Sequence, residues 1–260
     1  MRIINLAHGA LMMTAMYITF ICFHYLGIDP YLTLFISMPV LFFIGVVIQK
    51  YALNPLMEIE SILPENQVLM TVGIAMVLTE IARFIFSSDY KSVTTTYSGA
   101  TFFIGGISFS VALTVAFFIA LAFTFFMFWF LIKTDLGRSI RATAQDKEAA
   151  LLMGVNAKQI TVITFGIGSA LVAAAGTVLV PIYYLFPDIG GAFTRKAFVI
   201  TILGGLGSTV GALLGGLTLG LAEAFGATYI GIAYDDMIGL LIFILVLLFI
   251  PDGFKRLTRI

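Results

Sequence analysis

Two stretches of this sequence have residue types that could guide a small solute. In the first, NLAHGA, Asn5 and His8 stand at the threshold of a long apolar run, and Gly9 follows at once. Amide and imidazole groups can hydrogen-bond a solute, but they can equally satisfy neighbouring backbone groups. The spacing leaves both interpretations open, a position along a solute path and a purely structural role.

The second stretch is the run GGLGS, which contains Gly204, Gly205 and Gly207. Adjacent glycines weaken a helix, and unwound backbone inside a membrane is tolerated only where it contacts protein or a water-filled cavity. We therefore predict a helix break at residues 204–208, beside the path of the solute. Further glycines up to Gly220, some of them four residues apart, predict close packing between helices.

Charged residues within the apolar runs are few. Glu80 and Arg83 lie three residues apart, a spacing that suits an ion pair on one helical face. Glu223 lies near the end of its run. Ionisable groups near hydrocarbon are candidates for function, but these groups all lie toward one interface, which favours paired or solvated structural roles.

Catalytic chemistry finds no support in the sequence. No Gly-Lys dipeptide occurs, so the chain has no P-loop with which to bind ATP. The HExxH and G-x-S-x-G motifs of hydrolases are absent as well. We predict that the chain is not an enzyme and has no catalytic residues, no metal and no cofactor of its own.

The elements that carry these residues must cross a membrane. Of the 260 residues, 60% are hydrophobic and 11% are charged, whereas a soluble domain has about half and about a quarter. The net charge is zero, which gives no indication of nucleic-acid binding. A spanning helix needs about 20 apolar residues. Such runs fall at residues 9–27, 31–50, 66–87, 107–132, 159–185, 209–227 and 231–250.

The sequence thus predicts an all-α polytopic membrane protein in which residues 1–260 form one transmembrane domain. A further apolar stretch at residues 196–206 is short, and stretches of this length are more often re-entrant or half-spanning. We therefore expect about seven full transmembrane helices plus a short or broken span.

Lys and Arg residues in the loops set the orientation. Residues 133–158 contain the densest basic cluster, and the C-terminal tail is basic too, so both are placed in the cytoplasm with residues 51–65. This arrangement requires residues 196–206 to cross, wholly or as a broken half-helix. The outer loops are then 28–30, 88–106 and 186–195, and the tyrosines expected at the outer interface agree: Tyr25, Tyr31, Tyr183, Tyr184, Tyr229 and Tyr234.

Two segments outside the spans have a recognisable pattern. Residues 88–106 combine Thr, Tyr and Ser with a glycine pair, which predicts a short external hairpin or cap; it could be part of a docking surface or an ordinary loop. Residues 146–153 are strong helix formers, with Asp146 as the N-cap and Gly154 as the terminator. A short amphipathic helix held between two spans is a suitable shape for transmitting the motion of a partner.

With these residues in view, the sequence resembles the permease subunits of branched-chain amino acid ABC importers. The likeness extends from NLAHGA through RATAQDKEAALLMGV and KAFVITILGGLGSTVGALLGGLTLGLAEAF to the closing VLLFIPDGFKR. Its most specific element is Glu148-Ala149-Ala150 followed by Gly154, which looks like the EAA-x3-G pattern by which such permeases engage their ATPases. The residues expected to couple to an ATPase are Asp146, Glu148, Ala149, Ala150, Leu151, Met153 and Gly154.

The resemblance implies an all-helical, multi-pass permease of the cell membrane, paired with a second homologous permease or another copy of itself. Two cytoplasmic ATPases and an external solute-binding protein would complete the importer. Its solutes would be branched-chain or related hydrophobic amino acids, although relatives carry urea, short amides or small acids. The family also has a transmembrane helix ahead of NLAHGA; either the start was assigned late or this form lacks that helix.

Two other classes of protein remain as alternatives. An ion-coupled secondary transporter would use the break at 204–208 with carboxylates such as Glu80 or Glu223. A passive channel would need only the glycine-lined path. Neither class requires the polar segment 133–158.

Overall fold

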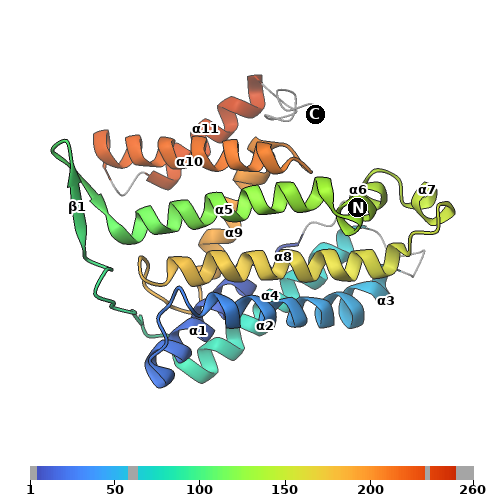
Figure 1. The fold of residues 1–260 in the computed structure, drawn as a ribbon, viewed down its shortest axis with the longest axis horizontal. Coiled ribbons are helices and arrows are strands. Elements are labelled where there is room, and N and C mark those ends of the chain that lie inside the picture. The colour runs from blue at the N-terminus through green and yellow to red at the C-terminus, as the bar shows by residue number, and fades with distance from the viewer. Residues whose placement is uncertain (1–4, 58–63, 232–234, 250–260) are drawn as a thin grey trace. The chain divides into compact units, whose positions relative to one another are not determined.

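The computed structural model describes residues 5–57, 64–231 and 235–249, and most of these residues are helical (Figure 1). The elements are α1 (His8–Leu26), α2 (Leu34–Val47), the π-helix η1 (Ile48–Leu53), α3 (Asn54–Met57), α4 (Pro64–Phe86), β1 (Thr101–Ile104), β2 (Ile107–Ser110), α5 (Val111–Lys133), α6 (Asp135–Gln145), α7 (Lys147–Leu152), α8 (Ala157–Leu179), α9 (Ile189–Gly204), α10 (Thr209–Tyr229) and α11 (Asp235–Phe249).

Six helical segments of the described chain are long and apolar enough to cross a membrane. They are His8–Leu26, Leu34–Leu56, Gln67–Phe86, Val111–Lys133, Ala157–Leu179 and Thr209–Tyr229. Each coincides with a predicted span, so the all-α polytopic fold is confirmed. The seventh predicted span overlaps α11, of which the structure describes 15 residues, Asp235–Phe249; residues 232–234 and 250 of that span lie outside the described residues.

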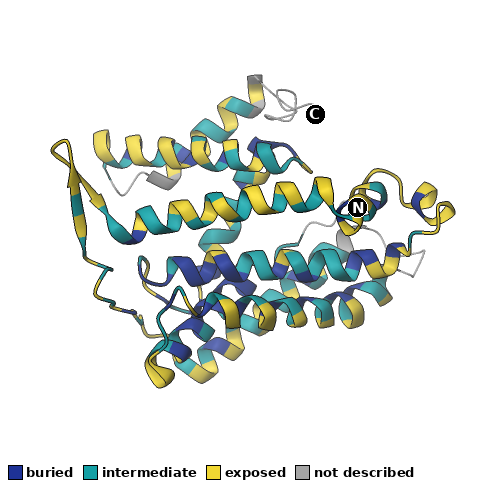
Figure 2. Cartoon of the chain, viewed as in Figure 1, coloured by how far each residue is buried: buried dark blue, intermediate teal, exposed yellow. Residues whose placement is uncertain are grey.

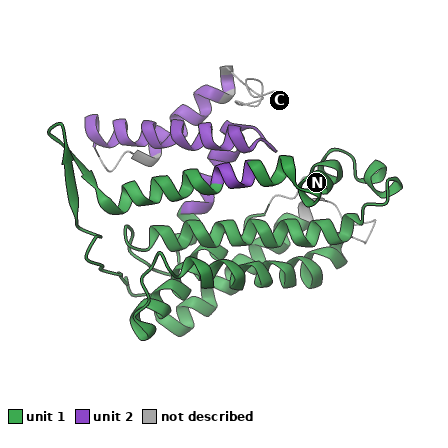
Figure 3. Ribbon diagram, viewed as in Figure 1, with its two compact units in different colours: residues 1–123, 129–192 green, residues 124–128, 193–260 purple. Residues whose placement is uncertain are grey.

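The structure divides into two compact units (Figure 3). The first comprises residues 1–123 and 129–192, and the second comprises residues 124–128 and 193–260. The first unit therefore contains α1 to α4, the hairpin and α6 to α8. The second contains most of α9, together with α10 and α11.

Small residues allow the helices of the first unit to approach closely. On α2, Gly45 lies against the side chain of Ser169 on α8, and on α8 Gly166 lies against Phe42 of α2. A methyl group added at Gly176 would lie 2.6 Å from the Met12 carbonyl oxygen of α1. Buried apolar residues on the same three helices form the core, which appears dark blue in Figure 2: Leu11, Ala15, Leu41 and Ala173.

Buried hydroxyl groups join α1, α2 and α8 near one end of the core. Thr19 Oγ1 donates to Thr177 Oγ1 at 3.0 Å, and the Ser37 and Thr177 hydroxyls lie 2.7 Å apart. All three residues are fully buried. Hydroxyl groups satisfied across helices are typical of membrane bundles, where an unsatisfied polar group is costly.

In the second unit α9 packs against α10 through glycine. A side chain at Gly204 would collide with the backbone of Gly211, and a methyl group at Gly215 would lie 2.7 Å from the Ile200 carbonyl oxygen. Val199, Leu203 and Leu219 form the small core beside this contact. The predicted close packing through glycines of residues 204–220 is therefore confirmed at Gly211 and Gly215.

Two predicted boundaries were wrong. Residues 189–195 are not an outer loop, because α9 begins at Ile189. Its first turn approaches the backbone of Gly9 closely at Gly190, and a contact so distant in the chain is not visible in local composition. The span predicted from residue 107 begins instead at Val111, because residues 107–110 pair as a strand.

Candidate functional site

A cavity of about 290 Å³ lies among α1, η1 and α8 of the first unit. Asn5 contributes from just before α1, His8 and Leu11 contribute from its start, and Gln49 contributes from η1. The remaining lining residues all come from α8: Thr161, Thr164, Phe165, Gly168, Ser169 and Val172. None of the residues that the structure places around the cavity is charged.

His8 presents a hydrogen-bond acceptor to this cavity. Its Nδ1 lies 2.5 Å from the Asn5 carbonyl oxygen, and a carbonyl only accepts, so Nδ1 carries the proton of the neutral ring. The other ring nitrogen, Nε2, is then an acceptor; it is buried and has no hydrogen-bond partner among the described residues. A solute with an N–H or O–H donor could supply that partner.

Asn5 shapes the turn that orients His8. Its side-chain Oδ1 accepts a hydrogen bond from the Ala7 backbone N–H at 2.9 Å, while its carbonyl receives the imidazole proton. Gly9, the third predicted path residue of this stretch, is buried where Gly190 meets its carbonyl group, and it does not line the cavity.

Gln49 is a cavity residue that sequence analysis missed. The side chain is fully buried, and its Nε2 donates to Asn54 Oδ1 at 2.9 Å. The π-helix Ile48–Leu53 widens the turn that carries it, and π-turns within α-helices are frequent at functional sites. In the sequence, the feature that could have indicated Gln49 is its amide side chain near the end of an apolar run.

The wall formed by α8 combines polar and apolar groups. The hydroxyls of Thr164 and Ser169 donate to carbonyls four residues earlier, at 2.7 and 2.9 Å. Phe165 and Val172 supply apolar surface. At Gly168 no described atom lies within 4 Å of where a Cβ would stand, so the wall is open there. The lining therefore suits a small solute with hydrogen-bonding groups and an apolar part.

The predicted helix break is confirmed in the second unit. Helix α9 ends at Gly204 and α10 begins at Thr209. Gly205 and Gly207 have φ values of 84° and 87°, in the left-handed region that glycine adopts without steric cost. Ser208 caps α10 by accepting a hydrogen bond from the Gly211 N–H at 2.9 Å. The role of the break in a solute path remains a prediction.

The polar segment between α5 and α8 folds into two helices, α6 and α7. The predicted N-cap is confirmed, because Asp146 Oδ1 accepts from the N–H groups of Glu148 and Ala149 at 2.9 and 3.0 Å. Gly154 terminates α7 with a φ of 83°. The N–H groups of Gly154 and Val155 close the end by donating to earlier carbonyls, a Schellman motif. Helix α6 was not predicted.

Apolar side chains project from the end of α7. Leu152 is 89% exposed and Met153 is 84% exposed, whereas Ala150 is buried. Glu148 and Ala149 are exposed as well. A rigid, capped helix with exposed apolar side chains is typical of a surface that contacts another protein.

Comparison with known proteins identifies the family. Residues 1–247 match the family described as branched-chain amino acid transport system permease component. The chain belongs to this family. It is accordingly a multi-pass membrane permease component, as its apolar helices also indicate.

Individual relatives cover nearly the whole permease. The chain is 34% identical to the high-affinity branched-chain amino acid transport system permease protein BraD of Pseudomonas aeruginosa, over 96% of this chain and 85% of the relative. It is 31% identical to LivH of Escherichia coli K12, over 96% and 84%. A probable LivH of Methanocaldococcus jannaschii is 27% identical over 98% and 85%. No solved structure matches the chain.

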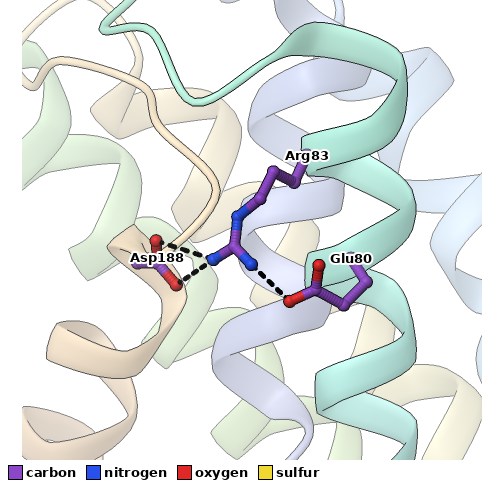
Figure 4. A network of polar contacts seen from close by, with 3 residues as sticks. All are labelled: Glu80, Arg83 and Asp188. Carbon is purple, nitrogen blue, oxygen red and sulfur yellow. Dashed lines mark hydrogen bonds and ion pairs between the residues drawn. The ribbon is translucent and has the colours of Figure 1, made fainter.

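Three carboxylates near the spans of the permease, Glu80, Asp188 and Glu223, are paired with cations. Arg83 contacts Glu80, as predicted, and also binds both carboxylate oxygens of Asp188 at 3.0 and 3.1 Å (Figure 4). Asp188 was missed because it lies 105 residues away in sequence. In the second unit, Lys196 Nζ lies 2.9 Å from Glu223 Oε2. Both carboxylates that an ion-coupled transporter could use thus have a partner.

Replacing Gly205 with Leu is expected to reduce uptake to background while the protein still inserts in the membrane. A side chain at positive φ costs about 1–2 kcal/mol, which would displace the chain between α9 and α10. Gly205→Asn is the matched control, since Asn tolerates this conformation. Uptake and membrane protein levels are measured together; a Leu variant that transports normally would contradict a role for the break.

Proposed function

We propose that the permease forms the solute path of an ABC importer for branched-chain or related hydrophobic amino acids, driven by ATP hydrolysis in partner subunits. The observation that carries this proposal is α7, which is capped at both ends, exposed, and bears the EAA-x3-G residues. In an ATP-driven importer, a permease without a P-loop must receive work from a partner that binds ATP. Helix α7 supplies a rigid element for that purpose between two spans.

The geometry of α7 supports a division of roles among its residues. Ala149 is small and exposed, so the backbone of a partner can approach it closely. Leu151, Leu152 and Met153 offer apolar contact, and Glu148 can reach a basic or hydrogen-bonding group. Asp146 and Gly154 hold the helix ends, while Ala150 is buried.

The cavity in the first unit supports the choice of solute class. It has the His8 acceptor for an amino group and the surfaces of Leu11, Phe165 and Val172 for an apolar side chain. BraD and LivH, by their names, serve branched-chain amino acid transport. We infer that Asn5 and His8 lie on the path and that the glycines at 204–207 bend a helix beside it.

The importer would contain a second homologous permease, two cytoplasmic ATPases and an external solute-binding protein. Residues 1–260 would act as one permease domain in the cell membrane, with α6, α7 and the C-terminus in the cytoplasm. The basic residues of 133–158 and of the tail support that orientation.

Reconstitution in lipid vesicles tests this function. The permease with its partner subunits and binding protein is expected to accumulate labelled leucine only when ATP is supplied. The permease alone is expected to accumulate none under a proton or sodium gradient. Gradient-driven accumulation by the permease alone would overturn the importer, whereas ATP-driven uptake of urea or an amide in place of leucine would overturn only the solute class.

A further inference from the structure

The β1–β2 hairpin has one wholly apolar face. The strands pair in antiparallel register, with Phe102 opposite Phe109 and Ile104 opposite Ile107. Because side chains alternate along a strand, these four residues share one face, and the two phenylalanine rings stack with centroids 5.6 Å apart. The other face carries Thr101, Phe103, Ser108 and Ser110.

The apolar face is exposed, and the hairpin carries no charged residue that would favour its contact with water. Ile104 is 62% exposed, Ile107 is 63% exposed and Phe109 is 40% exposed. The sequence contains no Asp, Glu, Lys, Arg or His between Lys91 and Lys133. A soluble protein rarely leaves such a surface uncovered unless the surface binds something.

The base of the hairpin is anchored on both sides. Tyr97, just before β1, donates to Asp29 Oδ2 at 2.8 Å and stacks on Tyr31. Burial raises the pKa of Tyr97, and the hydrogen bond to Asp29 raises it further, so the phenol keeps its proton. At the other side, the Val111 N–H donates to the Ala100 carbonyl at 3.0 Å, where α5 begins.

We propose that the β1–β2 hairpin is a membrane-interface anchor whose apolar face lies in the headgroup region where α5 enters the bilayer. The ligand is a lipid surface, recognised by apolar burial and not by charge. The two glycines of the turn, Gly105 and Gly106, both have positive φ, so they form the tight two-residue turn that keeps the four apolar side chains together.

The backbone of the hairpin determines how deeply the anchor can enter the membrane. A two-stranded hairpin has two open edges, and unpaired backbone groups cannot be placed in hydrocarbon. They can be hydrated among the headgroups, where aromatic side chains are favoured. An isolated hairpin is only marginally stable in water, so burial of its apolar face in lipid would also stabilise its pairing.

Continuity with α5 favours lipid over a protein partner. Strand β2 ends at Ser110, which is also the N-cap of α5. None of the spanning part of α5 is buried, and its first turns expose Leu113, Phe117 and Phe118. In Figure 1 the hairpin runs crosswise to α5 from the end of that helix. An apolar hairpin joined directly to an exposed, apolar spanning helix, and crosswise to it, can lie along the membrane surface.

Tryptophan placed on each face tests the anchor. The native Trp129 is first replaced by Phe, and Ile107→Trp and its neighbour Ser108→Trp are then made separately in the full-length permease. Both positions are exposed, so the fold should tolerate either change. The variants are reconstituted in vesicles of zwitterionic lipid that is brominated near the glycerol end of the acyl chain, and fluorescence quenching is measured.

We expect quenching of the Ile107→Trp variant to be at least about twofold stronger than that of the Ser108→Trp variant, and unchanged when anionic lipid is added, because apolar burial drives the contact. Equal quenching on both faces would overturn the proposal. So would a blue-shifted Ile107→Trp emission that brominated lipid does not quench, because the apolar face would then be covered by protein. Neither outcome depends on the proposed solute or its driving force.

Discussion

Replacing Glu148 with Arg is expected to separate the permease from its ATPase and to reduce ATP-driven uptake to background. Glu148 is exposed on the first turn of α7, where it can face a basic or hydrogen-bonding group of a partner. Reversing its charge replaces attraction by repulsion. Loss of one central contact of an interface costs about 2 kcal/mol or more, roughly thirtyfold in affinity.

Asp135→Arg is the matched control for this charge reversal. Asp135 lies in the same polar segment, on α6, and its side chain is 92% exposed. Its ion pair with Arg138 is solvated and should contribute little stability. Co-purification of the ATPase and solute-stimulated ATP hydrolysis are measured for both variants, and only Glu148→Arg is expected to lose them.

The end of α7 offers a second change that tests the same docking through shape. Gly154→Leu places a side chain at positive φ, which costs about 1–2 kcal/mol and would alter the Schellman end that positions Leu152 and Met153. Gly154→Asn should retain more coupling because Asn tolerates that conformation. If Glu148→Arg and Gly154→Leu both assemble and hydrolyse ATP with normal coupling, the docking role of α7 is wrong.

Filling the cavity at Gly168 is expected to block transport without loss of the fold. No described atom lies within 4 Å of a Cβ at this position, so a Leu side chain can enter the cavity beside Phe165 and Val172. We expect uptake to fall roughly tenfold or more. A solute that passes the added side chain must overcome a steric cost of about 1–3 kcal/mol, similar to the cost of overpacking a protein core. Protein level and thermal stability in detergent should stay unchanged.

Two controls make the cavity experiment specific. Gly168→Ala adds only a methyl group to open space and should leave uptake near normal, whereas Gly166→Leu would collide with Phe42 and Val46 and lower the protein level itself. Normal uptake by Gly168→Leu would show that this cavity is not on the path.

His8→Ala should raise the KM for the solute about tenfold, because one lost hydrogen bond is worth about 1.4 kcal/mol.

Local patterns were sufficient for the six long spans of this permease and for several short-range features, but not for α6 or for the start of α9. Six apolar runs predicted the spans because bilayer thickness imposes a minimum length on each helix. Asp146 and Gly154 predicted the two ends of α7, and the GGLGS run predicted the break after α9. Caps, positive-φ turns and the Glu80–Arg83 pair all involve residues within a few positions of one another, so their physics is contained in a short stretch of sequence.

Contacts between distant residues were decided only by the tertiary structure. Gln49 and the polar groups of α8 meet His8 in one cavity because η1 widens a turn and because glycines bring α1, α2 and α8 close together. Gly9 lies against Gly190, far along the chain, and Arg83 has Asp188 as a second partner. In a lipid-exposed chain almost every helix face is apolar, so hydrophobic periodicity carries little information about which faces meet; steric fit between small residues selects them.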